Sequence, residues 1–273
     1  MIPAPFTYQR ARTAEEALDL AAEAGDDGKY LAGGHSLLPL MKLRFAAPTV
    51  LIDLGRVSEL SYIRDEGNHV AIGALTRHHD VANSELLLID IPLLAHTAEA
   101  VGDPQIRHRG TIGGSVAHAD AAADLPAALL ALDATFVVRG PNGERSVPAS
   151  EFFRGIFETA IEPGELLTEI QVPKPAAPAA WSFQKFNKRA IDFAIVGVAV
   201  QGTSVALINM GSIPLRATAV ESALASGASA ADAAALAAEG TNAGSDIHAT
   251  REYREHLARV LVRRALEESS ARA

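Results

Sequence analysis

Two pairs of adjacent glycines constrain this chain more than any other feature. Gly33-Gly34 lies in the segment Ala-Gly-Gly-His-Ser (32–36), and Gly113-Gly114 lies in Thr-Ile-Gly-Gly-Ser (111–115). Glycine lets a backbone turn where a Cβ atom would clash, and it lets amide groups approach a ligand closely. Where such a turn begins a helix, the free amides favour an anion. One such pair is commonly only a tight turn, but two pairs with similar flanking residues predict two halves of one phosphate-binding site.

The spacing of the glycines excludes the two commonest nucleotide-binding motifs. Neither pair belongs to Gly-x-Gly-x-x-Gly, and the chain has no Gly-x-x-x-x-Gly-Lys-Ser/Thr sequence, so Rossmann and P-loop sites are both excluded. Ser36 and Ser115 follow the glycines but lie outside a Gly-x-Ser-x-Gly pattern, which argues against a nucleophile elbow. The sequence therefore predicts a phosphate site of another kind, and we assign no catalytic side chain.

Composition limits the classes of partner and cofactor. The 273 residues, 48% of them hydrophobic, suffice for one large domain or two ordinary ones. A net charge of −9 argues against a nucleic-acid partner. Because the chain has no cysteine, any iron–sulfur cluster must belong to another subunit. The sequence shows neither a long apolar run nor a signal peptide, so we expect a cytoplasmic protein without a transmembrane segment.

The nine histidines do not form a metal-binding pattern. None belongs to a His-x-x-x-His or His-Glu-x-x-His pair backed by a carboxylate, so we predict no metal site. His78 and His79 are adjacent and must point to different sides of either a helix or a strand. We expect both to be surface histidines.

Short helices and strands follow one another through the first 172 residues. Thr13 is a predicted N-cap, and Glu16 would complete a capping box at the first helix. A polar, basic loop (102–110) leads into Thr111, and Pro141-Asn142-Gly143 predicts a turn. The expected helices are 13–24, 36–44, 77–81, 92–101 and one from 124, and the expected strands are 29–32, 49–54, 62–64, 69–73, 135–139 and 165–172.

A Pro/Ala-rich segment (173–180) marks a predicted domain boundary. Beyond it, three alternating segments (181–186, 194–200 and 204–209) predict a small antiparallel sheet. Three helices then follow at 217–225, 230–239 and about 250–269. In the last helix the expected buried face comprises Tyr253, Leu257, Val260, Leu261 and Ala265.

Two charged positions have alternative interpretations. Asp124 precedes Leu125-Pro126, where it would be the N-cap of a helix, but its carboxylate would also accept hydrogen bonds from the hydroxyls of a ribose or ribityl chain. Lys185 belongs to a charged cluster with Lys188, Arg189 and Asp192, which is either a solvated loop between two strands or part of a site.

Several separated motifs together resemble one protein family, the FAD-binding medium subunits of the molybdenum hydroxylases. Within that family the sequence looks most like the medium subunit of carbon monoxide dehydrogenase. The resemblance covers essentially the whole chain. It rests on Ala-Gly-Gly-His-Ser-Leu-Leu-Pro (32–39), Thr-Ile-Gly-Gly-Ser (111–115), Ala-His-Ala-Asp-Ala-Ala-Ala-Asp-Leu-Pro (117–126), and the C-terminal segments 185–189, 192–196, 214–218 and 253–266.

This resemblance implies an α+β flavoprotein with two domains. The first, residues 1–174, would be a FAD-binding domain of vanillyl-alcohol-oxidase (PCMH) type with subdomains at about 1–56 and 57–174. The second, residues 179–273, would combine a three-stranded antiparallel sheet with a helical bundle. FAD would lie between the domains, contacted by Ala32, Gly33, Gly34, His35, Ser36, Thr111, Ile112, Gly113, Gly114, Ser115, Asp124, Lys185 and Phe193.

The resemblance assigns different roles to these residues. The two glycine segments would hold the diphosphate, Asp124 would bind the ribityl chain or the polar edge of the flavin, Lys185 would lie near the isoalloxazine ring, and Phe193 would shield one of its faces.

The resemblance also implies a role in electron transfer. Electrons would pass from [2Fe–2S] clusters in a small subunit to FAD and then to a terminal acceptor. A large subunit would carry the molybdopterin, and the assembly would be a dimer of heterotrimers. The alternative is a self-contained FAD-dependent oxidoreductase of the same fold without molybdenum partners. Substrate choice would belong to the molybdenum site, so this chain leaves the substrate open.

Overall fold

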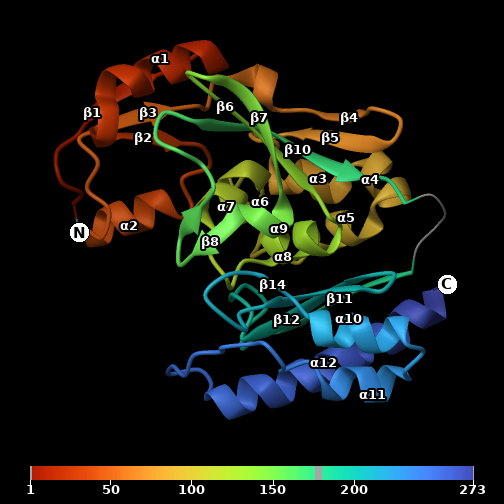
Figure 1. Cartoon of the computed structure of the whole chain (residues 1–273). Coiled ribbons are helices and arrows are strands. Elements are labelled where there is room, and N and C mark those ends of the chain that lie inside the picture. Colours follow the sequence, from red (N-terminus) through yellow and green to blue (C-terminus); the bar gives the residue numbers. More distant parts are fainter. Residues whose placement is uncertain (1, 176–179, 273) are drawn as a thin grey trace.

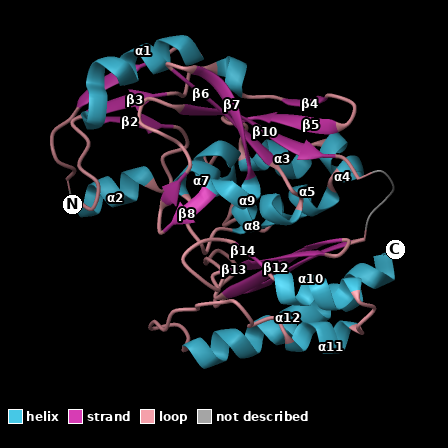
Figure 2. Cartoon of the chain, viewed as in Figure 1, coloured by secondary structure: helices cyan, strands magenta, loops and turns pink. Residues whose placement is uncertain are grey.

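The protein has a mixed α and β fold arranged in layers, as a computed structural model shows for residues 2–175 and 180–272. Figure 1 shows helix α1 above two sheets, a layer of helices below them, then a third sheet and a last layer of helices. Figure 2 shows the same alternation of helical and strand layers by colour. Within these described ranges, no helix has the length and apolar character needed to cross a membrane.

The first sheet contains three parallel strands. They are β1 (Thr7–Arg10), β3 (Val50–Asp53) and β2 (Gly28–Leu31), in that spatial order. Helix α1 (Ala14–Ala24) packs on β2 and β3, and α2 (Leu37–Leu43) follows the first glycine pair. Thr13 caps α1 as predicted, by accepting from the amide of Glu16 at 3.1 Å. The capping box is wrong in detail, because the Glu16 carboxylate accepts from the amide of Arg12 at 2.7 Å rather than from that of Thr13.

The second sheet is antiparallel and has five strands. Their spatial order is β4 (Ile63–Asp65), β5 (His69–Gly73), β10 (Leu166–Pro173), β6 (Thr135–Gly140) and β7 (Gly143–Pro148). The turn predicted at Pro141-Asn142-Gly143 joins β6 to β7. We did not expect β7, because its mixture of charged and apolar residues lacks a clear alternation.

A layer of short helices lies under the second sheet. It comprises α3 (His78–Asn83), α4 (Glu85–Asp90), α5 (Pro92–Glu99), α6 (Pro104–Arg107), α7 (Ile112–His118), α8 (Asp124–Ala131) and α9 (Ala149–Phe152), with a small hairpin of β8 (Phe153–Gly155) and β9 (Glu158–Thr159). Helix α6 lies within the segment 102–110, which we expected to be entirely a loop. Two 3₁₀ turns, Gly25–Asp27 and Ser58–Leu60, complete this half of the chain.

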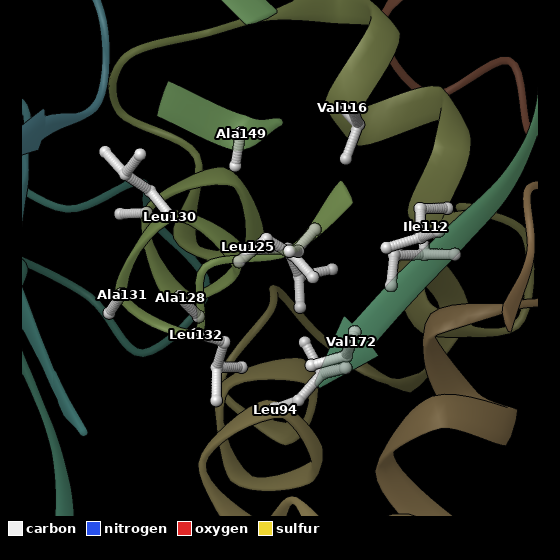
Figure 3. Packing of buried hydrophobic residues seen from close by; sticks show 14 of the residues in the cluster. Leu94, Ile112, Val116, Leu125, Ala128, Leu130, Ala131, Leu132, Ala149 and Val172 are labelled. Atoms are coloured by element: carbon white, nitrogen blue, oxygen red, sulfur yellow. The ribbon is translucent and has the colours of Figure 1, made fainter. Parts of the chain in front are cut away.

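Helix α8 is the centre of the main hydrophobic core. Every one of its eight residues is buried, as expected for a helix that is packed on all sides. Figure 3 shows Leu125 of α8 pointing into a cluster with Leu94, Ile112, Val116 and Val172. Asp124, a predicted site residue, is therefore the first residue of a helix that is buried along its whole length.

The third sheet is buried on both faces. Its order is β11 (Trp181–Phe186), β12 (Val196–Gln201), β13 (Ser204–Ile208) and β14 (Leu215–Arg216). Alternate residues point to opposite faces of a strand, so Ala199 and Ala206 join the main core on α8, whereas Val198 and Leu207 join a second core. The second core includes residues of α10 (Thr218–Ala225), α11 (Ala230–Ala235) and α12 (Arg251–Arg272).

Two expectations for this half need correction. The sheet has a fourth strand, β14, which is only two residues long and carries no periodic signal of its own. The buried face of α12 comprises Leu257, Ala258, Leu261, Val262 and Ala265, whereas Tyr253 is 44% exposed. Leu257, Leu261 and Ala265 are thus buried as predicted, whereas Tyr253 and Val260 are not, because the buried stripe instead includes Ala258 and Val262. Part of the Pro/Ala-rich boundary, residues 176–179, lies outside the described residues.

Candidate functional site

The structure brings the two glycine segments into direct contact. A Cβ atom added to Gly33 would lie 2.4 Å from the carbonyl oxygen of Arg109 and 2.9 Å from the Cα of Gly110. A Cβ atom added to Gly114 would lie 3.8 Å from that of Ala32. The loop after β2 therefore packs against the segment that leads into α7, and only a residue without a side chain fits at position 33.

The two glycine pairs have different backbone roles. Gly34 has a φ of +80°, so the first pair forms a real turn between β2 and α2. Gly113 and Gly114 do not form a turn, which corrects our expectation for the second pair, because they lie in the first turn of α7. Gly113 is required for close packing, since an added Cβ would lie 2.5 Å from the Cβ and the carbonyl oxygen of Ala74.

The two segments also differ in the amides that they leave free. In the second segment, the amides of Gly113, Gly114 and Ser115 donate to Ala74 O, Thr111 Oγ1 and Thr111 O, at 2.9, 3.1 and 3.0 Å. Among the described residues, no loop or cap hydrogen bond uses the amides at positions 33–36 as donors. The first segment is thus the one with backbone donors available for an anion.

A pocket of about 240 Å³ lies beside the first segment. It is located at the carboxyl ends of the parallel strands, because β1 ends at Arg10, β3 at Asp53 and β2 at Leu31, and these residues are neighbours in register. Open sheets with parallel strands bind ligands at this edge. The pocket is lined by Leu31, Ala32, Gly33, Gly34, Leu38, Asp53, Gly55 and the four arginines Arg10, Arg56, Arg77 and Arg109.

These arginines are the functional candidates that the sequence reasoning missed. Arg77 donates to the carbonyl oxygen of Arg109, and burial together with the charge of Arg109 lowers the pKa of Arg77. Arg10 donates to the hydroxyl of Tyr8 at 3.1 and 3.2 Å and lies 3.6 Å from Asp53. Their positions in the sequence could have indicated them, because Arg10 is the last residue of one parallel strand and Arg56 follows the end of another.

Asp124 and Lys185 form a buried ion pair. Lys185 Nζ lies 2.7 Å from Asp124 Oδ2 and donates to the carbonyl oxygen of Ala100 at 3.1 Å. The Asp124 side chain is only 5% exposed, and that of Lys185 is only 8% exposed. Burial raises the pKa of Asp124 to about 6, while the charge and hydrogen bond of Lys185 act in the opposite direction. The other carboxylate oxygen, Oδ1, is buried and has no partner among the described residues.

This pair settles two of the alternatives that the sequence left open. The N-cap of α8 is Ala123, and no side chain caps that helix, so the N-cap interpretation of Asp124 is wrong. Lys185 lies within β11 rather than in a solvated loop, although Lys188 and Arg189 are exposed between β11 and β12. Two residues that are 61 positions apart thus meet at the contact between α8 and the third sheet.

The other predicted site residues lie in varied surroundings. The side chain of Ile112 is fully buried in the main core, so it contributes packing. Ser36 and Ser115 are half-buried, whereas His35 is exposed. Phe193 is 61% exposed and precedes β12. Its ring is therefore available to a ligand or to another protein.

His78 contradicts our expectation of a surface histidine. It is only 5% exposed, and a Cβ added to Gly110 would lie 2.7 Å from its Nε2 atom. Its backbone amide donates to the carbonyl oxygen of Gly110 at 3.1 Å. Burial, followed by the charge of His35, lowers the pKa of His78 to about 4. His79 instead stacks on His108, with 3.9 Å between the ring centroids.

Two known protein families match consecutive parts of this chain. The family described as "FAD binding domain in molybdopterin dehydrogenase" matches residues 4–175, and "CO dehydrogenase flavoprotein C-terminal domain" matches residues 181–269. The chain belongs to the medium FAD subunits of carbon monoxide dehydrogenase and related molybdenum hydroxylases. The resemblance that the sequence motifs indicated is confirmed.

Relatives of known identity cover the full length of the chain. The medium chain of carbon monoxide dehydrogenase from Hydrogenophaga pseudoflava is 41% identical over 285 residues, which covers 100% of this chain and 99% of the relative. A solved structure of that enzyme, lacking the Mo-pyranopterin moiety, superposes with a TM-score of 0.97 at 42% identity and covers 100% of both chains. Subunit alpha of the 6-hydroxypseudooxynicotine dehydrogenase complex of Paenarthrobacter nicotinovorans is 39% identical over 287 residues, covering 100% of this chain and 97% of the relative.

The cofactor of this domain family is FAD, and the residues present fit it. The turn at Gly33-Gly34 has amides free for a diphosphate, and arginines surround it. The unpartnered Oδ1 of Asp124 suits a hydroxyl or an N–H donor of the cofactor. Within the described residues, no three His, Asp or Glu side chains are grouped closely enough to hold a metal ion.

Proposed function

We propose that this chain is the electron-transfer flavin subunit of a molybdenum hydroxylase. In this proposal a small partner subunit with [2Fe–2S] clusters supplies electrons, and a large partner subunit carries the molybdopterin. When bound, FAD supplies the redox chemistry that passes these electrons to a terminal acceptor. The absence of cysteine in the chain supports this division, because the iron–sulfur ligands must come from another subunit.

One observation carries the proposal: the glycine loop 32–36, whose amides are free, packs on the segment before α7, and the buried Asp124–Lys185 pair follows after α7 in the chain. Thr111, which caps α7, follows the segment that packs on Gly33, and Asp124 follows the other end of α7. The seven residues of α7 span about 10 Å, and residues 119–123 connect α7 to Asp124. We infer that an extended dinucleotide connects these two features, with its diphosphate on the first glycine loop and its flavin near Lys185.

In this arrangement each segment has a distinct role. The loop 32–36 would bind the diphosphate through its free amides, and Thr111, Gly113, Gly114 and Ser115 would form the surface against which it packs. Ile112 would anchor that surface in the core. Asp124 Oδ1 would accept a hydrogen bond from the ribityl chain or the flavin edge, and Lys185 would place a positive charge beside the ring. Phe193 would cover one face of the flavin.

We also propose the corresponding domain division. The FAD-binding domain of PCMH type would extend over residues 1–174, with subdomains at about 1–56 and 57–174. This division is supported by the separate parallel and antiparallel sheets of the two segments. The C-terminal domain, residues 179–273, would contain the third sheet and its helices. The full assembly would be a dimer of heterotrimers.

Purification from the native source tests this function. We expect the chain to co-purify with a larger and a smaller subunit, and the complex to contain FAD, molybdenum and iron. A flavoprotein that is isolated alone, without molybdenum or iron, and that oxidises a substrate would support the self-contained oxidoreductase instead. A complex that contains no flavin, and that retains none after incubation with FAD and removal of the unbound cofactor, would contradict both.

A further inference from the structure

The pocket at the carboxyl ends of the first sheet carries a charge cluster that the glycine motifs do not explain. Arg10, Arg56, Arg77 and Arg109 line it, and Asp53 is the one carboxylate in its lining. Four positive charges and one negative charge leave a net charge of three positive units. Such a cluster attracts a phosphate-bearing ligand.

Two of the four arginines are already occupied by protein groups. Arg77 donates to the carbonyl oxygen of Arg109, while Arg10 contacts Tyr8 and Asp53. Asp53 is also held by the amide of Gly55, which donates to Oδ1 at 2.8 Å. Among the residues that the structure describes, the side chains of Arg56 and Arg109 make no hydrogen bond or ion pair. These two guanidinium groups are free for a ligand.

Arg56 and Arg109 approach the pocket from different parts of the chain. Arg56 follows β3 of the parallel sheet, whereas Arg109 lies between α6 and α7. The backbone of Arg109 packs directly on Gly33, so its side chain starts next to the loop with free amides. A ligand that contacts both guanidinium groups would bridge the two sides of the pocket. Arginine is suited to this role because its planar fork of donors matches a phosphate group.

We propose that Arg56 and Arg109 bind the adenosine diphosphate half of the cofactor and fix its direction in the site. The adenylate end lies in the arginine pocket, and the flavin end lies toward Asp124 and Lys185. This inference rests on the proposed FAD-binding function and adds two residues that belong to neither glycine motif. Their contribution is to anchor the half of the cofactor that takes no part in electron transfer.

Calorimetric titration of the full, flavin-free chain with FAD and with ADP tests this inference. ADP lacks the flavin, so its affinity reports on the arginine pocket without the Lys185 side of the site. The variants are Arg56→Gln and Arg109→Gln. Arg263→Gln is the matched control, because Arg263 is also exposed and lies on α12, where it makes a long, exposed ion pair with Glu267 at 3.9 Å.

We expect ADP to bind to the unmodified chain in competition with FAD. Each pocket variant should weaken both FAD and ADP by roughly 10-fold or more, as is typical for loss of a charge-assisted hydrogen bond to phosphate. The control should bind like the unmodified chain. Unchanged affinities, a loss confined to one of the two arginines, or a chain that binds FAD but not ADP would overturn the inference while leaving FAD binding intact. A chain that binds no FAD would overturn the proposed function itself.

Discussion

Lys185 of the third sheet reaches Asp124 at the start of α8, with 2.7 Å between Nζ and Oδ2, at a site almost closed to solvent. The same lysine donates to the carbonyl oxygen of Ala100. This contact joins the C-terminal sheet to the helical layer of the N-terminal part. A second polar contact between these layers is the 2.6 Å ion pair of Arg216 with Asp133. The interface that would hold the flavin therefore also attaches the C-terminal sheet to the N-terminal helical layer.

Replacing Lys185 by methionine should destabilise the protein strongly. The substitution leaves the Asp124 carboxylate buried without its partner, and removing one member of a buried pair costs about 3–5 kcal/mol. The free energy of unfolding in urea measures the effect. In the double variant Asp124→Asn/Lys185→Met the loss should be smaller than the sum of the two single losses, because the groups are coupled. Additive losses would show that the pair does not act as a unit.

FAD affinity should increase with pH around the pKa of Asp124. This pKa is raised to about 6 by burial, and a cofactor hydroxyl that donates to Oδ1 prefers the ionised form. Protonation of Asp124 below pH 6 should therefore weaken binding. Fluorescence titration with FAD between pH 5 and pH 7.5 measures the slope. The variant Asp124→Asn cannot ionise and should lose this dependence, and a slope that persists in it would assign the effect to another group.

Gly33→Ala should weaken FAD binding without unfolding the chain. The new Cβ would meet the carbonyl oxygen of Arg109 at 2.4 Å, which forces the two segments of the phosphate site apart. We expect a loss of roughly 10-fold or more in FAD affinity, comparable to the loss of one hydrogen bond to a charged group. Gly244→Ala is the control, because the site of its Cβ is open and its φ is not positive. Equal effects of the two substitutions would indicate that the contact at Gly33 is unimportant.

Much of the fold follows from local sequence signals. Thr13 and Gly25 delimit α1, and the turn at Pro141-Asn142-Gly143 joins two strands, because caps and turns are encoded by the residues that form them. Local sequence signals did not predict those elements and buried faces that depend on tertiary packing. The short strand β14 exists only because it pairs with β13, and the buried stripe of α12 depends on the sheet beneath it.

In the candidate site, too, local sequence signals predicted some features and missed those that depend on tertiary packing. The glycine motifs indicated a phosphate site, and family resemblance indicated Asp124 and Lys185, but no local pattern predicts that these two side chains meet. The four arginines were missed because they are dispersed in sequence: Arg10 and Arg56 meet through the order of the parallel strands, whereas Arg77 and Arg109 reach the same pocket from the loops before α3 and α7. His78 was misjudged because its burial depends on contact with Gly110, which lies 32 positions later.

His78 should make the protein less stable at mildly acidic pH. Its pKa is lowered to about 4 in the folded protein, whereas the unfolded chain takes up a proton near pH 6.5. Unfolding therefore binds a proton between these values, so the stability that is present above pH 6.5 is lost as the pH falls toward 4. The loss attributable to His78 should be about 2 kcal/mol between pH 7 and pH 5.

Comparison with His78→Gln isolates this contribution. The free energy of unfolding of both proteins should be measured in urea from pH 5 to pH 7.5, and the difference between them should change with pH as described. His79→Gln is the adjacent control, because His79 is stacked on His108 and is less buried. A difference between His78→Gln and the unmodified protein that stays constant with pH would contradict the buried, neutral state of His78.

In the proposed function this chain binds one FAD, with the diphosphate on the loop 32–36 and the flavin beside Lys185. Titration of the purified, flavin-free chain with FAD, followed by flavin absorbance, tests it most directly. We predict saturation at one FAD per chain, a shift of the flavin bands on binding, and a different shift in Lys185→Met because the positive charge beside the ring is absent. A chain that leaves the FAD spectrum unchanged, or a Lys185→Met variant whose bound spectrum matches that of the unmodified protein, would contradict the claim.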